Sequence, residues 1–199
     1  MERTNIRTTE STKTLVFTAV MTAIVVVLQL VAILTRAVLP AFAINLVLIP
    51  IVIGAAIGGA KVGAWLGFVS GVAVLVSGDA SAFLAVSIVG TLTVVLVKGV
   101  VSGIAAAGVY KLFEKKNKYL AVLAAAVVCP IANTGIFIIG CFVFFMDTVR
   151  AWGSAMGFEN AFAYIILGMV GINFIIELVL NLVLSPATVR LLDIKNKHL

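Results

Sequence analysis

The sequence predicts an all-α integral membrane protein with six transmembrane helices and both termini in the cytoplasm. Of its 199 residues, 63% are hydrophobic and 11% are charged, and the mean hydropathy is +1.25. Soluble domains average about 45–50% apolar and about 25% charged residues. The apolar residues recur in blocks along the chain, and about 20 of them in one helix cross a hydrocarbon core. We therefore expect a single membrane domain over residues 1–199 and not a soluble enzyme, a nucleic-acid-binding domain or a disordered protein.

The first expected span, over residues 14–34, follows a polar cytoplasmic tail over residues 1–13 that has no cleavage site. Two shorter spans are expected over residues 43–57 and 62–76. The apolar stretch over residues 83–113 would form about 46 Å of helix, which is longer than a bilayer needs. Because glycines and polar residues fill its first part, we expect an outer loop over residues 77–91 and a helix over residues 92–113. The last two spans, over residues 119–145 and 161–192, flank an outer loop over residues 146–160.

The positions of Lys and Arg predict the orientation. With the N-terminus inside, the outer segments carry only Arg36 and Arg150, and Lys98 lies within a span. The inner segments carry the remaining eleven basic residues, which are Arg3, Arg7, Lys13, Lys61, Lys111, Lys115, Lys116, Lys118, Arg190, Lys195 and Lys197. Cytoplasmic loops carry an excess of Lys and Arg, so both termini are expected to be cytoplasmic. The net charge of +6 then needs no nucleic-acid partner.

Small residues recur four apart in several spans. The longest such ridge lies in and just before the third span, at Gly59, Gly63, Gly67 and Gly71. Lipid tails are as apolar as leucine, so membrane helices associate by close packing at ridges of this kind. We expect the glycines to pack within the chain. Ala19 and Ala23 repeat the spacing in the first span, where packing within the chain and contact with another membrane protein are equally good interpretations.

Two ionisable residues lie at the same depth within the expected spans. Lys98 is 13 residues before Lys111 and Glu177 is 13 residues before Arg190, which places both about 20 Å above the inner face. A charge within the hydrocarbon costs roughly 2.5–3.5 kcal/mol on insertion scales, so each residue needs a structural or functional partner.

Further polar residues lie near the same depth. Asn133 and Thr134 lie at about 22 Å on the fifth span, and Asn173 lies one turn from Glu177 on the same helix face. One interpretation is an ion pair between Lys98 and Glu177 that holds two helices together. The other is a polar pocket open to the outside that binds a small solute with a carboxylate and hydrogen-bonding groups.

The outer loops offer two further candidates for contact with a solute. Arg36 lies in the first outer loop and Trp152 in the last, and both loops are placed to close over the pocket. Otherwise Arg36 is a solvated charge and Trp152 an anchor at the membrane interface.

The sequence contains no pattern that predicts a reaction. It has no GxxxxGK[ST] run, no HExxH or paired-cysteine metal pattern and no GxSxG serine. We therefore expect no enzyme, no metal and no cofactor, but a binding subunit that depends on a partner for energy. Two rival hypotheses remain: a proton-coupled secondary transporter that uses Glu177, and a membrane assembly protein without transport activity.

Five segments together resemble the substrate-binding S components of energy-coupling-factor (ECF) transporters. They are TAVMTAIVVVL at 18–28, IPIVIGAAIGGAKVGAWLGFVSGV at 49–72, VKGVVSGIAAAGVYKLF at 97–113, IANTGIF at 131–137 and GINFIIELVLNLVLSPATVRLL at 171–192. The resemblance covers residues 13–193. The loop after the second span reads Gly-Gly-Ala-Lys, where relatives often have Gly-Pro before the Lys.

The resemblance implies a six-helix protein of a bacterial or archaeal cytoplasmic membrane that binds a vitamin or related micronutrient from outside with high affinity. It also implies association with a membrane scaffold protein and two cytoplasmic ATPases, with Ala19 and Ala23 at the scaffold contact. The ligand would lie among the outer loops and outer helix halves that carry Lys98, Asn133, Asn173 and Glu177.

The resemblance is greatest to the group of pantothenate and folate carriers. Three Tyr and two Trp offer little stacking surface for thiamin or riboflavin. A basic, amide-lined pocket suits a small carboxylate, so pantothenate is the first candidate, with lipoate, a queuosine precursor or another micronutrient as alternatives.

Overall fold

Helices make up every regular element in the part of the chain that the structure describes. The computed structural model describes the backbone over residues 2–38 and 46–197 and the side chains over residues 12–35 and 46–193. In chain order the elements are α1 (Glu2–Val38), α2 (Leu48–Val76), α3 (Ser81–Val86), α4 (Ile88–Phe113), α5 (Lys118–Phe144), α6 (Met146–Ala155), α7 (Ala161–Ala163), the π-helix η1 (Tyr164–Val170) and α8 (Gly171–Lys197). The predicted all-α class is confirmed, and five helical segments are long and apolar enough to cross a membrane.

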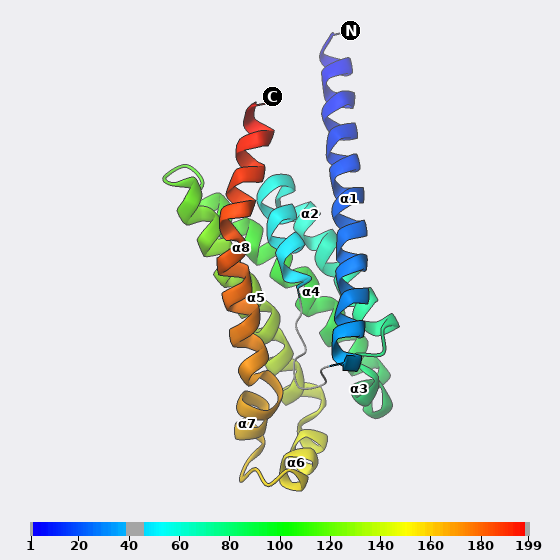
Figure 1. The fold of residues 1–199 in the computed structure, drawn as a ribbon. Helices are drawn as coiled ribbons and strands as arrows, with labels where there is room; N and C mark the ends of the chain where they lie inside the picture. Colours follow the sequence, from blue (N-terminus) through cyan, green and yellow to red (C-terminus); the bar gives the residue numbers. More distant parts are fainter. Residues whose placement is uncertain (1, 39–45, 198–199) are drawn as a thin grey trace.

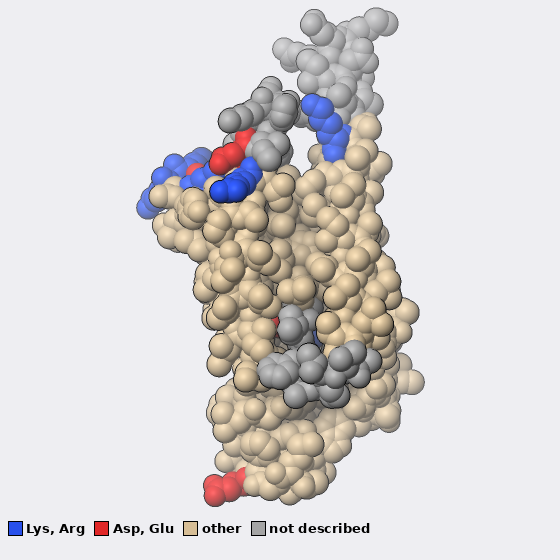
Figure 2. Space-filling view, viewed as in Figure 1, with Lys and Arg blue, Asp and Glu red and all other residues tan. Residues whose placement is uncertain are grey.

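The long helices form an elongated bundle with two unlike ends. Figure 1 places the beginning of α1 and the end of α8 at one end, and α3, α6 and α7 at the other. Basic side chains gather at the end that carries both termini, above a long body with few charges on its surface (Figure 2). The apolar body is the part that a bilayer would cover.

α2 consists of two arms that turn back on each other at Gly59. This residue has φ 77° and ψ −169°, a backbone region that is essentially restricted to glycine. In a straight helix, Gly54 and Leu66 would lie about 18 Å apart. In the structure, a Cβ built on Gly54 would overlap the Leu66 side chain, so the two arms lie against each other. The two arms correspond to the predicted spans over residues 43–57 and 62–76, of which residues 43–45 lie outside the described part of the chain.

The second arm of α2 packs backbone to backbone against α4. A Cβ on Gly63 would lie 2.6 Å from the Gly103 carbonyl oxygen, and one on Gly71 would lie 3.0 Å from the Val95 oxygen. Gly67 meets Gly99 in the same way. The expected contact within the chain is therefore confirmed for these three glycines of the ridge. It is wrong for Gly59, which forms the turn and has open space around it.

One face of α1 packs along α2. Val25 and Ala32 are buried, with 0% and 6% of their surface exposed. The indole Nε1 of Trp65 donates a hydrogen bond of 3.1 Å to Thr22 Oγ1 on the same face of α1. Ala19 and Ala23 are exposed and lie outside this face.

Two predicted loops contain helices. α4 begins at Ile88 and not at residue 92, because Ser87 is extended and its side chain accepts a hydrogen bond of 3.2 Å from the Gly90 amide as an N-cap. α3 occupies residues 81–86 of the expected loop over 77–91, and α6 occupies most of the expected loop over 146–160. The predicted last span over residues 161–192 is interrupted at Gly171, where η1 ends and α8 begins.

Candidate functional site

A cavity of about 350 Å³ lies between the long helices and α3. Its walls come from α1, α2, the α2–α3 connection, α3, α4, α5, η1 and α8, and from Phe145 just after α5. The lining residues are Gln29, Ala32, Val74, Asp79, Ala80, Phe83, Thr91, Val94, Val95, Lys98, Asn133, Thr134, Phe137, Phe145, Met169, Val170, Asn173, Phe174 and Glu177. Small-molecule sites in proteins typically measure about 300–1,000 Å³ and are mostly apolar with a few polar groups.

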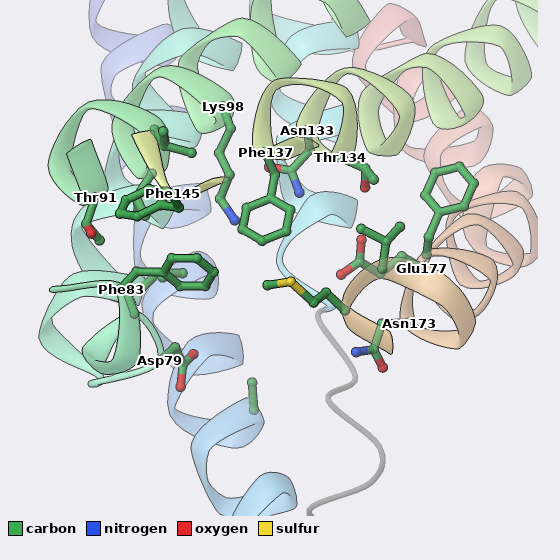
Figure 3. A pocket seen from close by; sticks show the side chains of 18 of the residues that line it. Asp79, Phe83, Thr91, Lys98, Asn133, Thr134, Phe137, Phe145, Asn173 and Glu177 are labelled. Carbon is green, nitrogen blue, oxygen red and sulfur yellow. The ribbon is translucent and has the colours of Figure 1, made fainter. Parts of the chain in front are cut away.

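The structure brings the five predicted intramembrane polar residues to this one cavity. Lys98 comes from α4, Asn133 and Thr134 from α5, and Asn173 and Glu177 from α8. Figure 3 shows the side chains of Lys98 and Glu177 pointing toward the cavity from opposite sides. The five residues from three helices therefore line one cavity, whereas their common depth in the membrane and their role in substrate binding stay predictions.

Lys98 rests against an aromatic ring. Its Nζ atom lies 5.4 Å from the centroid of the Phe137 ring, a cation–π arrangement. The ion pairs that join described residues are Lys118 with Asp193 at 2.6 Å and Arg150 with Asp147 at 3.9 Å, and a bridge between Lys98 and Glu177 is not among them. Lys98 therefore presents its charge at the cavity wall without the ion pair that was the alternative interpretation.

The opposite wall carries hydrogen-bonding groups of α8. Glu177 is only 9% exposed, and its backbone carbonyl accepts a hydrogen bond of 2.8 Å from Asn181 Nδ2. One turn earlier, the Oδ1 atom of Asn173 is buried and has no hydrogen-bond partner. A buried polar atom without a partner typically costs about 1–3 kcal/mol, so this amide has capacity to bind a further group.

Gln29 and Asp79 form a polar wall that the sequence analysis missed. Gln29 Nε2 donates hydrogen bonds of 2.7 Å to Asp79 Oδ2 and 3.3 Å to Ser77 Oγ, which ties α1 to the connection between α2 and α3. The available signal was the position of Gln29, since it is a single amide within an apolar span, seven residues after Thr22 on the same helix face.

Phenylalanines supply the aromatic surface of the cavity. Phe83 of α3 makes edge-to-face contacts with Phe137, Phe145 and Trp152, at centroid distances of 5.8, 4.9 and 5.4 Å. Trp152 is not among the lining residues, so the structure places it behind Phe83 and not at the predicted ligand contact. The side chain of Arg36, the other loop candidate, lies outside the described part. The count of Tyr and Trp also underestimated the stacking surface, because four phenylalanines line the cavity.

Comparison with known families assigns the chain. Residues 13–189 match the model of the family described as ECF transporter, substrate-specific component. The chain belongs to this family. Searches of curated proteins and of solved structures each gave no match.

Membership makes the chain a transport protein of the cell membrane whose task is to bind a substrate. Substrate-specific (S) components bind small molecules and associate with an ECF scaffold and ATPase module. The expectations of an S component, of a multi-pass membrane location and of a transport role instead of an enzymatic one agree with the family. The cavity described above is the candidate substrate site of this S component.

Proposed function

We propose that this S component captures a small micronutrient carboxylate, with pantothenate the first candidate, in the cavity between α4, α5 and α8. The scaffold protein and two cytoplasmic ATPases then supply the energy that moves the substrate inward. The observation that carries the proposal is the position of Lys98 at the cavity wall beside Phe137. A cation at this depth costs roughly 2.5–3.5 kcal/mol on insertion scales, and the carboxylate of a bound substrate would offset that cost.

The rest of the cavity suits the same class of substrate. Amides and hydroxyls from α5 and α8 can bind a substrate amide and hydroxyl groups, while Val94, Val95 and Met169 can contact its methyl groups. Pantothenate combines a carboxylate, an amide, two hydroxyls and a branched apolar centre. Its polar groups thus find partners on several walls of the cavity.

A six-span arrangement with cytoplasmic termini is part of this proposal. The five long segments include α2, whose two arms reverse direction at Gly59, so the chain would cross the membrane six times. An even number of crossings agrees with Figure 1, in which the beginning of α1 and the end of α8 lie at the same end. The basic residues at that end favour the cytoplasmic side. The cavity then opens nearer the outer face.

Binding measurements on the purified chain test the substrate site. Lys98→Met should weaken pantothenate binding about 10- to 100-fold, because a hydrogen bond to a charged group contributes about 1.5–3 kcal/mol. Lys111→Met is the matched control, since Lys111 is exposed near the end of the same helix. Calorimetric titration measures both affinities, and equal loss in the two variants would contradict the proposed role of Lys98. Native mass spectrometry of the protein as purified identifies a bound small molecule independently.

The scaffold contact is proposed to lie on α1 at Ala19 and Ala23. Both residues are exposed and stand apart from the face of α1 that packs along α2. Ala19→Trp or Ala23→Trp should block uptake by the assembled transporter and leave substrate binding intact. Ile24→Trp is the control, because Ile24 is also exposed but lies about 100° around the helix from Ala23. Uptake by the purified chain alone, driven by a proton gradient, would contradict the dependence on ATPases.

A further inference from the structure

We infer that the cavity selects a substrate with two different ends and binds it in one orientation. An anionic group of the substrate contacts Lys98, and a hydroxyl or N–H group donates a hydrogen bond to the α8 wall at Glu177 and Asn173. The inference rests on the proposed function, which places a small carboxylate in the cavity, and adds which groups the substrate must carry and which residue recognises each.

The first observation is the separation of opposite charges across the cavity. Lys98 and Glu177 belong to α4 and α8 and point toward the cavity from opposite sides (Figure 3). The ammonium group of Lys98 lies 5.4 Å from the centroid of the Phe137 ring, which belongs to α5. The two ends of the cavity therefore differ in sign, and a substrate that lies between them meets a cation at one end and a carboxyl group at the other.

The second observation is a buried hydrogen-bond acceptor without a partner on the α8 wall. Glu177 contributes carboxyl oxygens, and Asn173 contributes a buried Oδ1 atom that has no hydrogen-bond partner. A buried acceptor gains most from a donor brought by the ligand, because water competes little for it there. A substrate with a donor at this end thus offers a partner to the Asn173 Oδ1 atom, which a purely apolar substrate would leave without one.

These two walls together fix the orientation. A reversed substrate would place its carboxylate against the Glu177 carboxyl group and its hydroxyl against Lys98. The substrate would then lose the attraction of its carboxylate to Lys98 and gain an unfavourable contact between two carboxyl groups. Sites that hydrogen-bond a substrate hydroxyl also reject analogues that lack it. Among the candidates, pantothenate has a carboxylate at one end and hydroxyls at the other, whereas lipoate has a carboxylate but no donor at its far end.

A crossed comparison of variants and ligands tests the inference. The probes are pantothenate, its primary carboxamide, its analogue without hydroxyls, and lipoate, each titrated against the purified full chain. The wild-type chain should bind pantothenate at least tenfold more tightly than either analogue and more tightly than lipoate. Lys98→Met should lose the preference for the acid over the carboxamide and keep the preference for hydroxyls. Glu177→Leu should do the reverse.

Asn173→Leu gives a second measurement on the α8 wall if Glu177→Leu does not fold, and it should also reduce the preference for hydroxyls. Lys111→Met should change neither preference. Wild-type binding of pantothenate and its hydroxyl-free analogue with equal affinity would overturn this inference and leave the proposed function standing. Loss of the hydroxyl preference in Lys98→Met, instead of Glu177→Leu, would overturn it as well. Failure of all four probes to bind would overturn the proposed substrate and the inference together.

Discussion

Gly67 of α2 and Gly99 of α4 lie backbone against backbone at the centre of the helix bundle. A Cβ built on either residue would overlap the carbonyl group of the other. Gly63 with Gly103 extends the contact by one turn, and Gly71 extends it in the other direction to the Val95 backbone. This close approach positions α4, and with it Lys98, relative to the rest of the bundle.

Gly67→Ala should destabilise the protein, because the added methyl group meets backbone atoms that cannot rotate away. Inserting a methyl group into a packed interior typically costs about 1–3 kcal/mol, so the Tm in detergent should fall by several degrees. Gly108→Ala is the matched control, since Gly108 lies on α4 with no atom within 4 Å of its added Cβ. An unchanged Tm for Gly67→Ala would show that α2 and α4 can separate at no cost.

Gly59→Ala should destabilise the protein for a different reason. Its added Cβ meets no atom within 4 Å, so the cost comes from the backbone alone, at φ 77°. A non-glycine residue in this region typically costs about 1–3 kcal/mol. Gly108→Ala again serves as the control, because its position has equal space but no positive φ. Thermal unfolding of the two variants isolates the backbone strain, since neither added Cβ is crowded, and equal Tm values would mean that the turn of α2 adapts to a side chain.

Much of the fold could be predicted because long apolar segments identify membrane helices in a sequence. α5 and three of the four ridge glycines on α2 agree with the predictions, and the first predicted span lies within α1, which begins earlier, at Glu2. Gly59 could not be assigned correctly, since spacing alone does not distinguish a glycine that packs from one that turns the chain. The beginning of α4 was also misplaced, because glycine and serine read as loop residues in soluble proteins but pack between helices in membranes.

The candidate site was partly predictable for a related reason. Charges and amides within apolar spans are costly, so Lys98 and Glu177 stood out, and counting from basic anchors gave their depth. Phe83 and Phe145 carry no such signal, because a phenylalanine in a membrane protein faces lipid as readily as a cavity. Depth in the membrane was inferred only for polar residues of the last three spans, so Gln29 on the first span was missed. Its hydrogen-bond partner Asp79 lies in the α2–α3 connection.

The hydrogen bond from Trp65 to Thr22 should contribute measurably to the attachment of α1. Hydrogen bonds between membrane helices average about 0.6 kcal/mol in double-mutant cycles, with values up to about 1.7. Trp65→Phe and Thr22→Val should therefore show a coupling energy in this range when their unfolding free energies are combined. A cycle with Trp152→Phe in place of Trp65→Phe is the control and should be additive within about 0.5 kcal/mol, since Trp152 packs against Phe83 and not against α1. Additivity in both cycles would contradict a role for the bond.

Phe83→Leu should loosen α3 and weaken substrate binding together. Phe83 makes ring contacts with three aromatic side chains and also lines the cavity, whereas α3 itself has only six residues and no buried one. Each aromatic pair contributes about 0.5–1.5 kcal/mol beyond its buried area. The loss of three pairs therefore removes more stabilising free energy than a helix of six residues can replace with other contacts.

Phe142→Leu is the control for this prediction, because Phe142 is 42% exposed and its ring contacts only Phe162 among the described aromatic pairs. Amide hydrogen exchange over residues 78–91 should become faster in Phe83→Leu alone, and calorimetric titration should show weaker binding in the same variant. Faster exchange with unchanged affinity would mean that α3 covers the cavity without contacting the substrate. Unchanged exchange would mean that the capping of α4 by Ser87, and not the aromatic cluster, holds α3 in place.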